Sequence, residues 1–132
     1  MAMILLVDDD EPLRRALGKA LRKAGYEVHE APTGREAMQA LDSTEPDLVL
    51  TDINMPEMDG IEVLIQFRRA RPHVPIVAMS GGGLLPKQLL LRNAAALGAA
   101  VTIEKPFELH DLLATLGSML AKAAAAPAPP EE

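Results

Sequence analysis

The sequence predicts a doubly wound α/β domain, in which five parallel strands form one sheet with five helices on its two faces. Short apolar segments alternate along the chain with longer segments of helical period, which is typical of a parallel sheet with crossover helices. Two segments, 4–7 and 48–50, are apolar at every position, as in central strands covered by helices on both faces. The 132 residues suffice for one such domain.

The first strand is predicted over residues 3–7 and the first helix over 12–24. This helix has Pro12 in its first turn and Gly25 as its C-terminal stop. Its apolar stripe, which we expect to face the core, is Leu13, Ala16, Leu17, Ala20 and Leu21.

The remaining elements follow in the same alternation. We predict strands over 26–30, 47–51, 75–79 and 100–103. Thr33 and Glu36 form a capping-box pattern that starts a second helix, ending at about Leu41. A third helix is predicted over about 60–70, a fourth from Pro86 to Gly98, and a fifth after Pro106. The apolar face of the fifth helix is predicted to contain Leu109, Leu112, Leu113, Leu116, Met119 and Leu120.

The domain is expected to occupy residues 1–122. Residues 123–132 are rich in alanine and proline, which indicates a flexible tail or a shortened linker.

Composition excludes several classes of function. The net charge of −6 argues against direct binding of nucleic acid, and an aromatic content of 2% leaves few side chains for stacking on bases or flavins. The absence of cysteine excludes disulfides and thiolate metal sites and suits a reducing cytoplasm. No apolar run reaches the roughly 20 residues that a membrane-spanning helix needs. We therefore expect a cytoplasmic protein whose partners are proteins.

Polar residues follow the predicted strands at the edge where parallel strands end. Asp8, Asp9 and Asp10 follow the first strand, Asp52 follows the third, Ser80 the fourth, and Lys105 comes soon after the fifth. In an open parallel sheet, functional groups gather at this edge. Clustered carboxylates repel one another unless a cation compensates, and oxygen ligands suit Mg²⁺. The pattern predicts a site in which a metal, Lys105 and Ser80 contact a phosphoryl group on Asp52.

Four motifs resemble those of the receiver domains of two-component response regulators. Residues 4–10 read ILLVDDD, 48–60 read LVLTDINMPEMDG, 75–80 read PIVAMS and 104–107 read EKPF. Each motif alone is weak, but four in this order and strand context are specific. The resemblance extends from residue 3 to about 122, and implies a flavodoxin-like, CheY-like sheet with strand order 2-1-3-4-5.

The resemblance also implies a function. The chain would be a phosphorylation-activated switch, taking a phosphoryl group from a histidine kinase or a histidine phosphotransfer protein onto Asp52. It would catalyse only its own phosphorylation and dephosphorylation. Mg²⁺ would be held by Asp8, Asp9, Asp52 and the backbone carbonyl of Asn54, with Asp9 as the direct ligand of the acid pair. Ser80 would be the switch hydroxyl and Lys105 the conserved cation. The face formed by the fourth helix, fifth strand and fifth helix would bind an effector domain or a second copy.

Two features depart from the family pattern. Thr102 stands where receivers often have a switch tyrosine or phenylalanine, and three glycines follow Ser80. We therefore expect the loop from Gly81 to Leu85, rather than an aromatic side chain, to carry much of the conformational change. Leucines at 84, 85 and 89–91 exceed what one buried helix face holds, so they either form an apolar surface or fold onto the domain edge.

Three other functions remain open at this point. A haloacid-dehalogenase-type phosphatase would use Asp8 as its nucleophile and Asp10 as its acid, but Pro12 replaces the usual threonine or valine. A flavodoxin-type module would need hydroxyl groups, not three aspartates, after the first strand. A degenerate receiver would act only as a docking module, although every chemical position is filled.

Overall fold

A computed structural model describes residues 2–52, 60–80, 101–105 and 107–125 of the chain. Strands and helices alternate along these segments. In chain order they are β1 (Met3–Val7), α1 (Glu11–Lys23), β2 (Glu27–Ala31), α2 (Gly34–Ser43), β3 (Leu48–Asp52), α3 (Gly60–Ala70), β4 (Ile76–Ser80), β5 (Val101–Glu104) and α5 (Leu109–Ala125).

The five strands form one sheet in the order β2-β1-β3-β4-β5, and each pair of neighbours is parallel. In the centre, Ile4 of β1 lies opposite Val28 of β2 on one side and Leu48 of β3 on the other. The predicted fold class and strand order are therefore confirmed. Strand β1 has neighbours on both sides, as its uniformly apolar sequence predicted.

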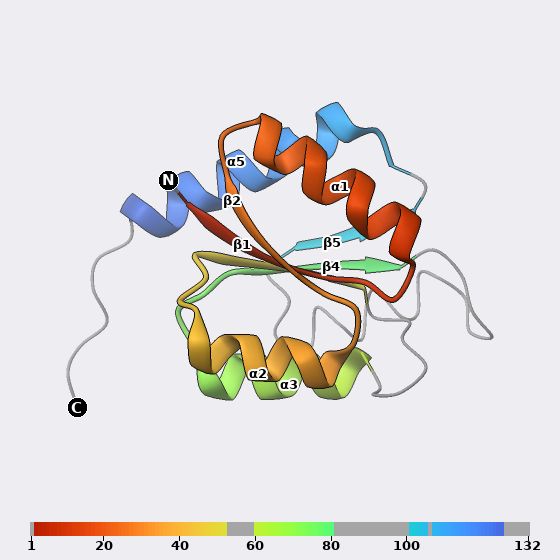
Figure 1. The fold of residues 1–132 in the computed structure, drawn as a ribbon. Helices are drawn as coiled ribbons and strands as arrows, with labels where there is room; N and C mark the ends of the chain where they lie inside the picture. The colour runs from red at the N-terminus through yellow and green to blue at the C-terminus, as the bar shows by residue number, and fades with distance from the viewer. Residues whose placement is uncertain (1, 53–59, 81–100, 106, 126–132) are drawn as a thin grey trace.

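Helices cover both faces of the sheet, with α1 and α5 on one face and α2 and α3 on the other (Figure 1). Alternate residues of β1 pack against the helices on opposite faces of the sheet, because successive side chains of a strand point to opposite faces. Ile4 and Leu6 pack with Leu17 and Leu21 of α1. On the opposite face, Leu5 and Val7 belong to a second core cluster with α2 and α3. Two core layers thus hold the central strands in place, and with them the residues at their ends.

Local signals in the sequence place the helix ends. Asp10 caps α1, because its carboxylate accepts a hydrogen bond from the Leu13 N–H at 3.2 Å. Thr33 caps α2 by accepting from the Glu36 N–H at 3.1 Å. Gly25 follows α1 with a φ of +104°, a backbone conformation that favours glycine.

The boundaries of four strands differ from the prediction by one residue. Strands β2 to β5 begin and end one position later than expected, so Asp52 and Ser80 are the last residues of β3 and β4 rather than the first residues beyond them. Proline explains the start of β4, because Pro75 has no N–H to donate and offers only its carbonyl, which accepts from the Val49 N–H at 3.0 Å.

The buried stripe of α1 is also rotated relative to the prediction. Ala16 is exposed, and Leu13 and Ala20 are half-buried. The buried residues are Arg14, Leu17, Gly18 and Leu21, which follow the same helical spacing. An arginine therefore occupies a buried position that the predicted apolar stripe did not include. A smaller difference affects α5, where Leu109 is 42% exposed although it was expected to face the core.

Several predictions lie outside the described residues: the fourth helix, the glycine loop after Ser80, the leucines between 84 and 91, and the tail beyond 125. Helix α5 itself continues to Ala125, past the expected domain end at 122. Within the described segments, no helix combines the length and apolar character required to span a membrane.

Candidate phosphoacceptor site

The candidate site lies at the carboxyl edge of the sheet. Asp8 follows β1 directly, Asp52 is the last residue of β3, and Lys105 follows β5. Val7 pairs with Thr51 across the two central strands, so the next residues along the chain, Asp8 and Asp52, are neighbours. The topology thus brings together residues that are 97 positions apart in the sequence, as with Lys105 and Asp8.

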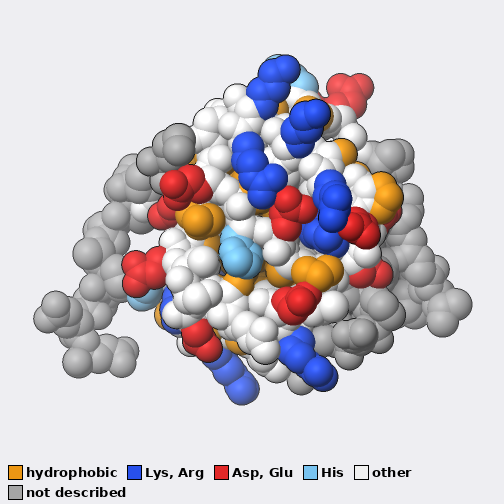
Figure 2. Space-filling view, viewed as in Figure 1, with side chains coloured by type: hydrophobic (Ala, Val, Ile, Leu, Met, Phe, Trp, Pro, Cys, Tyr) orange, Lys and Arg blue, Asp and Glu red, His pale blue; other side chains and the backbone are white. Residues whose placement is uncertain are grey.

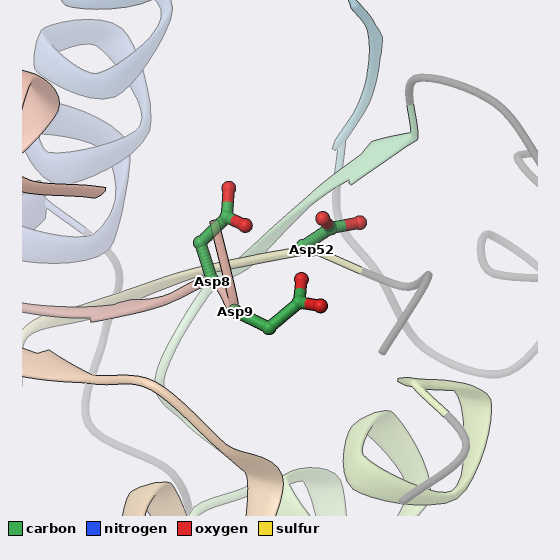
Figure 3. A group of neighbouring side chains, drawn as sticks. All are labelled: Asp8, Asp9 and Asp52. Atoms are coloured by element: carbon green, nitrogen blue, oxygen red, sulfur yellow. The ribbon is translucent and has the colours of Figure 1, made fainter. Parts of the chain in front are cut away.

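Three carboxylates meet at this edge. Asp8, Asp9 and Asp52 each place one oxygen within 4.8 Å of the others. Figure 3 shows Asp8 and Asp9 reaching from the end of β1 toward Asp52. Asp8 is fully buried and Asp52 is 5% exposed, whereas Asp9 is open to solvent. Among the three acids, Asp9 is therefore the one whose side chain contacts solvent.

Lys105 supplies the positive charge in this cluster. Its Nζ donates to Asp8 Oδ2 at 3.0 Å and to Asp52 Oδ2 at 3.1 Å. Burial alone would lower the pKa of Lys105 below 10.5, but the negative charges of Asp52 and Asp8 outweigh burial and raise the pKa. The ammonium group therefore stays charged at neutral pH and connects the two buried carboxylates.

Asp8 is held on both of its carboxylate oxygens. Oδ1 accepts from the Asp10 N–H at 3.0 Å, while Oδ2 accepts from Lys105. Asp10, in contrast, uses its side chain to cap α1 and is not part of the acidic cluster. The Asp10 side chain therefore serves the helix end, and its backbone N–H serves Asp8.

The donor set fits a hard divalent cation. All three candidate ligands are carboxylates, and Mg²⁺ prefers oxygen ligands. In their charged forms the three acids carry three negative charges and Lys105 compensates one, so about two remain in a partly dry site. A single Mg²⁺ would neutralise that remainder.

Some predicted site residues are not placed by the structure. Asn54 lies outside the described residues, and only the backbone of Ser80 and Thr102 is described. Ser80 nevertheless ends β4, adjacent to β3, where Asp52 pairs with Met79. The strand topology therefore puts Ser80 at the same sheet edge as Asp52.

Sequence reasoning missed Arg14. This side chain is only 8% exposed, and its Nη1 donates to the backbone carbonyl of Asp8 at 3.0 Å. Residue 14 lies outside the apolar stripe predicted from the sequence, so the helical pattern gave no signal that this arginine is buried.

The family model of the response regulator receiver domain matches residues 4–117 of the chain. The chain belongs to the response regulator receiver family. Its strand order and acidic edge are those that the sequence motifs led us to expect of a receiver.

Named relatives agree with this assignment. The receiver is 39% identical over 120 residues to the response regulator receiver protein CpdR of Brucella abortus (strain 2308), covering 91% of this chain and 98% of CpdR. It is 37% identical over 117 residues to the response regulator MprA of Mycolicibacterium vanbaalenii, covering 89% of this chain. The chain spans only about half of MprA, 49% of its length.

Solved structures show the same fold. The crystal structure of a response regulator receiver domain protein (CheY-like) from Methanospirillum hungatei JF-1 matches with a TM-score of 0.86 and 29% identity. The match covers 94% of this receiver and 97% of that chain.

The geometry does not favour the phosphatase alternative. That reading requires Asp8 as the nucleophile and Asp10 as the acid. Asp8 is fully buried with both carboxylate oxygens hydrogen-bonded, and the Asp10 side chain caps a helix.

Proposed function

We propose that this receiver is a phosphorylation-activated switch that accepts a phosphoryl group on Asp52 from a histidine kinase or a histidine phosphotransfer protein. The observation that carries the proposal is the position of Asp52. Its carboxylate ends a central strand, contacts Lys105 and lies within 4.8 Å of two further acids. It therefore combines a nucleophilic oxygen with adjacent groups able to bind a cation and a phosphoryl group.

The chain's own residues divide the work of phosphoryl transfer. An Asp52 carboxylate oxygen attacks phosphorus, the bond from phosphorus to the donor nitrogen breaks, and its electron pair stays on the imidazole. Lys105 fixes the rotation of the Asp52 carboxylate through Oδ2 and places a positive charge where phosphoryl oxygens gather. The Ser80 hydroxyl is proposed to donate to another of these oxygens.

Mg²⁺ is the proposed cofactor, held by Asp9 and Asp52 with Asp8 beside them and the Asn54 carbonyl as a further ligand. When bound, the ion supplies positive charge that stabilises the phosphoryl oxygens. The carboxylate-only donor set and its excess negative charge support this choice over a softer metal. In this scheme the protein modifies itself and does not turn over a diffusible substrate.

The partners are proposed to be proteins. The net charge is −6, and on the face shown in Figure 2 the described Lys and Arg side chains are interspersed with Asp and Glu. Neither feature suits a polyanion such as DNA. We propose that the signal passes to an effector domain or a second copy through the region that includes β5 and α5, and that the protein acts in the cytoplasm.

The proposal is tested by intact-mass spectrometry after incubation with a small acyl phosphate and Mg²⁺. Wild-type protein should gain the mass of one phosphoryl group, and the gain should disappear when the metal is chelated. Asp52→Asn should gain nothing.

Asp42→Asn is the matched control for that experiment, because Asp42 is an exposed aspartate of α2 outside the acidic cluster. It should be phosphorylated like the wild type. A mass gain that persists in Asp52→Asn would overturn the proposed function.

A further inference from the structure

Helix α1 buries a charged side chain beside the acidic site. Arg14 occupies the first position of the buried stripe that continues with Leu17, Gly18 and Leu21, and it is 8% exposed. A buried guanidinium is costly unless it is paired and hydrogen-bonded. The partners of Arg14 therefore indicate what its burial achieves.

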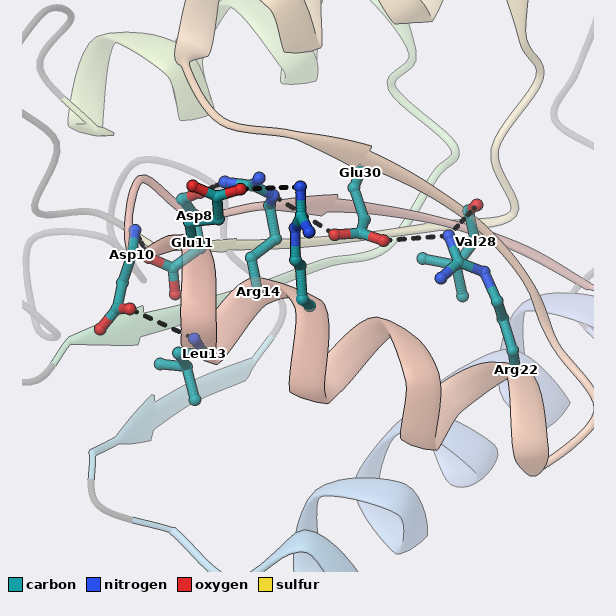
Figure 4. Close-up of polar contacts among 9 residues, drawn as sticks. Asp8, Asp10, Glu11, Leu13, Arg14, Arg22, Val28 and Glu30 are labelled. Carbon is teal, nitrogen blue, oxygen red and sulfur yellow. Dashed lines mark hydrogen bonds and ion pairs between the residues drawn. The ribbon is translucent and has the colours of Figure 1, made fainter.

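Arg14 connects Glu30, near the end of β2, to the backbone of the acidic site (Figure 4). Its Nη1 donates to the Asp8 carbonyl at 3.0 Å, a buried hydrogen bond. Its Nε lies 3.4 Å from Glu30 Oε1, in an ion pair that does not meet hydrogen-bond geometry. The second oxygen of Glu30 accepts from Arg22 Nη2 at 3.1 Å, so one carboxylate is held between two arginines.

The surface of α1 is shaped to receive Glu30. Arg14, Gly18 and Arg22 are spaced four residues apart and lie on one face of the helix. A Cβ added at Gly18 would lie 2.9 Å from Glu30 Oε2, closer than van der Waals contact allows. The glycine thus leaves the space in which Glu30 spans the two arginines.

Residues at the end of β2 hold the backbone of Asp8 in two ways, directly through Ala31 and indirectly through Glu30 and Arg14. The Asp8 N–H donates to the Ala31 carbonyl at 3.2 Å, and the Asp8 carbonyl accepts from Arg14, which Glu30 holds. Glu30 and Ala31 are consecutive residues. The peptide groups on both sides of Asp8 are therefore each held by a hydrogen bond, and the one that joins Asp8 to Asp9 is held by Arg14.

This peptide group determines where Asp9 points. Asp9 is the exposed acid of the cluster, and among the described residues no hydrogen bond or ion pair holds its carboxylate. Its direction depends on the backbone that precedes it. We infer that Arg14, anchored by Glu30, is a positioning residue that keeps the Asp9 carboxylate beside Asp8 and Asp52 for metal binding. The inference rests on the proposed function and deepens it.

The direction in which Mg²⁺ affinity changes when Arg14 is replaced distinguishes a positioning role from a purely electrostatic one. Arg14 is a cation close to a proposed cation site, so its charge alone weakens Mg²⁺ binding. If Arg14 acted only through charge, Arg14→Met would bind Mg²⁺ more tightly and Arg14→Lys would bind it as the wild type does. If Arg14 acts by positioning, both variants bind more weakly, because lysine lacks the planar fork that reaches the carbonyl and Glu30 together.

The experiment titrates ¹⁵N-labelled protein with MgCl₂ and follows the backbone amides of residues 8–10 by NMR. Arg14→Met should weaken Mg²⁺ binding by roughly 10-fold or more, as expected for a group that orients metal ligands. Arg14→Lys should weaken it by a smaller factor. The matched control is Arg71→Met, because Arg71 likewise donates to a backbone carbonyl, that of Leu41 at 2.8 Å, on the other helical layer. It should bind like the wild type.

Each outcome of the Mg²⁺ titrations either supports or overturns the positioning role of Arg14. Wild-type or tighter binding by folded Arg14→Met overturns the inference, and so does equal weakening in Arg71→Met, which would indicate a general loss of stability. If Arg14→Met does not fold, Arg14→Lys decides, and wild-type affinity there overturns the inference. Failure of the proposed function appears separately, as wild-type protein that neither responds to Mg²⁺ nor gains a phosphoryl group on Asp52.

Discussion

At the scale of single residues, the site depends on Lys105 as the cation shared by two buried acids. Asp8 and Asp52 are almost inaccessible to water, and each accepts a hydrogen bond from the same ammonium group. Two unpaired carboxylates in that position would repel each other in a medium of low dielectric constant. Lys105 therefore stabilises the domain when no metal is bound, besides its proposed part in phosphoryl transfer.

Lys105→Met should lower the free energy of unfolding by about 1–3 kcal/mol in the absence of Mg²⁺, because it removes the hydrogen bonds and the positive charge that Lys105 gives to two buried carboxylates. Adding Mg²⁺ should stabilise the variant more than the wild type, because the ion then meets three negative charges without a competing ammonium. Urea unfolding with and without Mg²⁺ measures both effects. Lys122→Met, at an exposed position of α5, should change neither. Equal stabilisation by Mg²⁺ in variant and wild type would contradict this role of Lys105.

The residues of the site were predictable to different degrees. Asp8, Asp52 and Lys105 could be predicted because each stands at the end of a recognisable strand, and parallel strands end at one edge. Arg14 could not be placed in the same way. Its partners are the Asp8 carbonyl and Glu30, and only the pairing of β1 with β2 brings Glu30 to the face of α1.

At the scale of secondary-structure elements, α1 begins at a residue that belongs to the same acidic run as the site. Asp10 caps the helix through its carboxylate, while its backbone N–H holds Asp8 Oδ1. The side chain of Asp10 thus stabilises the start of α1, while its backbone N–H holds the carboxylate of Asp8. A substitution that changes only the side chain separates the two.

Asp10→Ala should destabilise the domain by about 1 kcal/mol through loss of the N-cap, while phosphorylation of Asp52 continues because the backbone N–H remains. Asp10→Asn should keep most of the stability, since asparagine is also a good N-cap. Thermal unfolding and intact mass provide the two measurements. Loss of phosphorylation in folded Asp10→Ala would show that the Asp10 carboxylate belongs to the site after all.

Two glycines in the described part should respond oppositely to alanine. Gly25 follows α1 at a φ of +104°, so Gly25→Ala should cost about 1–2 kcal/mol of stability. Gly117 lies inside α5, where an added Cβ would meet only the Tyr26 hydroxyl at 3.8 Å. Gly117→Ala should therefore stabilise the domain by up to about 1 kcal/mol. Urea unfolding of both variants checks the pair, and destabilisation by Gly117→Ala would contradict the packing described.

The identity of the elements was easier to predict than their limits. Glycine, proline and capping residues mark the ends of α1 and α2, and the structure uses Asp10, Gly25 and Thr33 in this way. Strand limits have weaker markers, because a fully buried strand has no alternation to show where pairing stops. The one-residue shift of β3, which is buried at every residue, follows from this.

At the scale of the whole molecule, the sheet serves to collect residues that are distant in sequence. Helices on both faces bury every residue of β3 and most of β1, which leaves the strand ends as the places where polar groups reach solvent. The alternating pattern predicts this architecture, since parallel strands require crossover helices. It does not by itself specify which strands are neighbours. The order β2-β1-β3-β4-β5 was expected from the family motifs, and it places Asp8 beside Asp52.

We propose that the sheet edge makes Asp52, and not another acid of the cluster, the acceptor of the phosphoryl group. Borohydride reduction of protein treated with an acyl phosphate and Mg²⁺ converts an aspartyl phosphate to homoserine, which peptide mass spectrometry locates. Homoserine at position 52 alone is the result that we predict. Homoserine at position 8 or 9, or a phosphoryl group that resists reduction because it is on Ser80 or Thr51, would contradict the account.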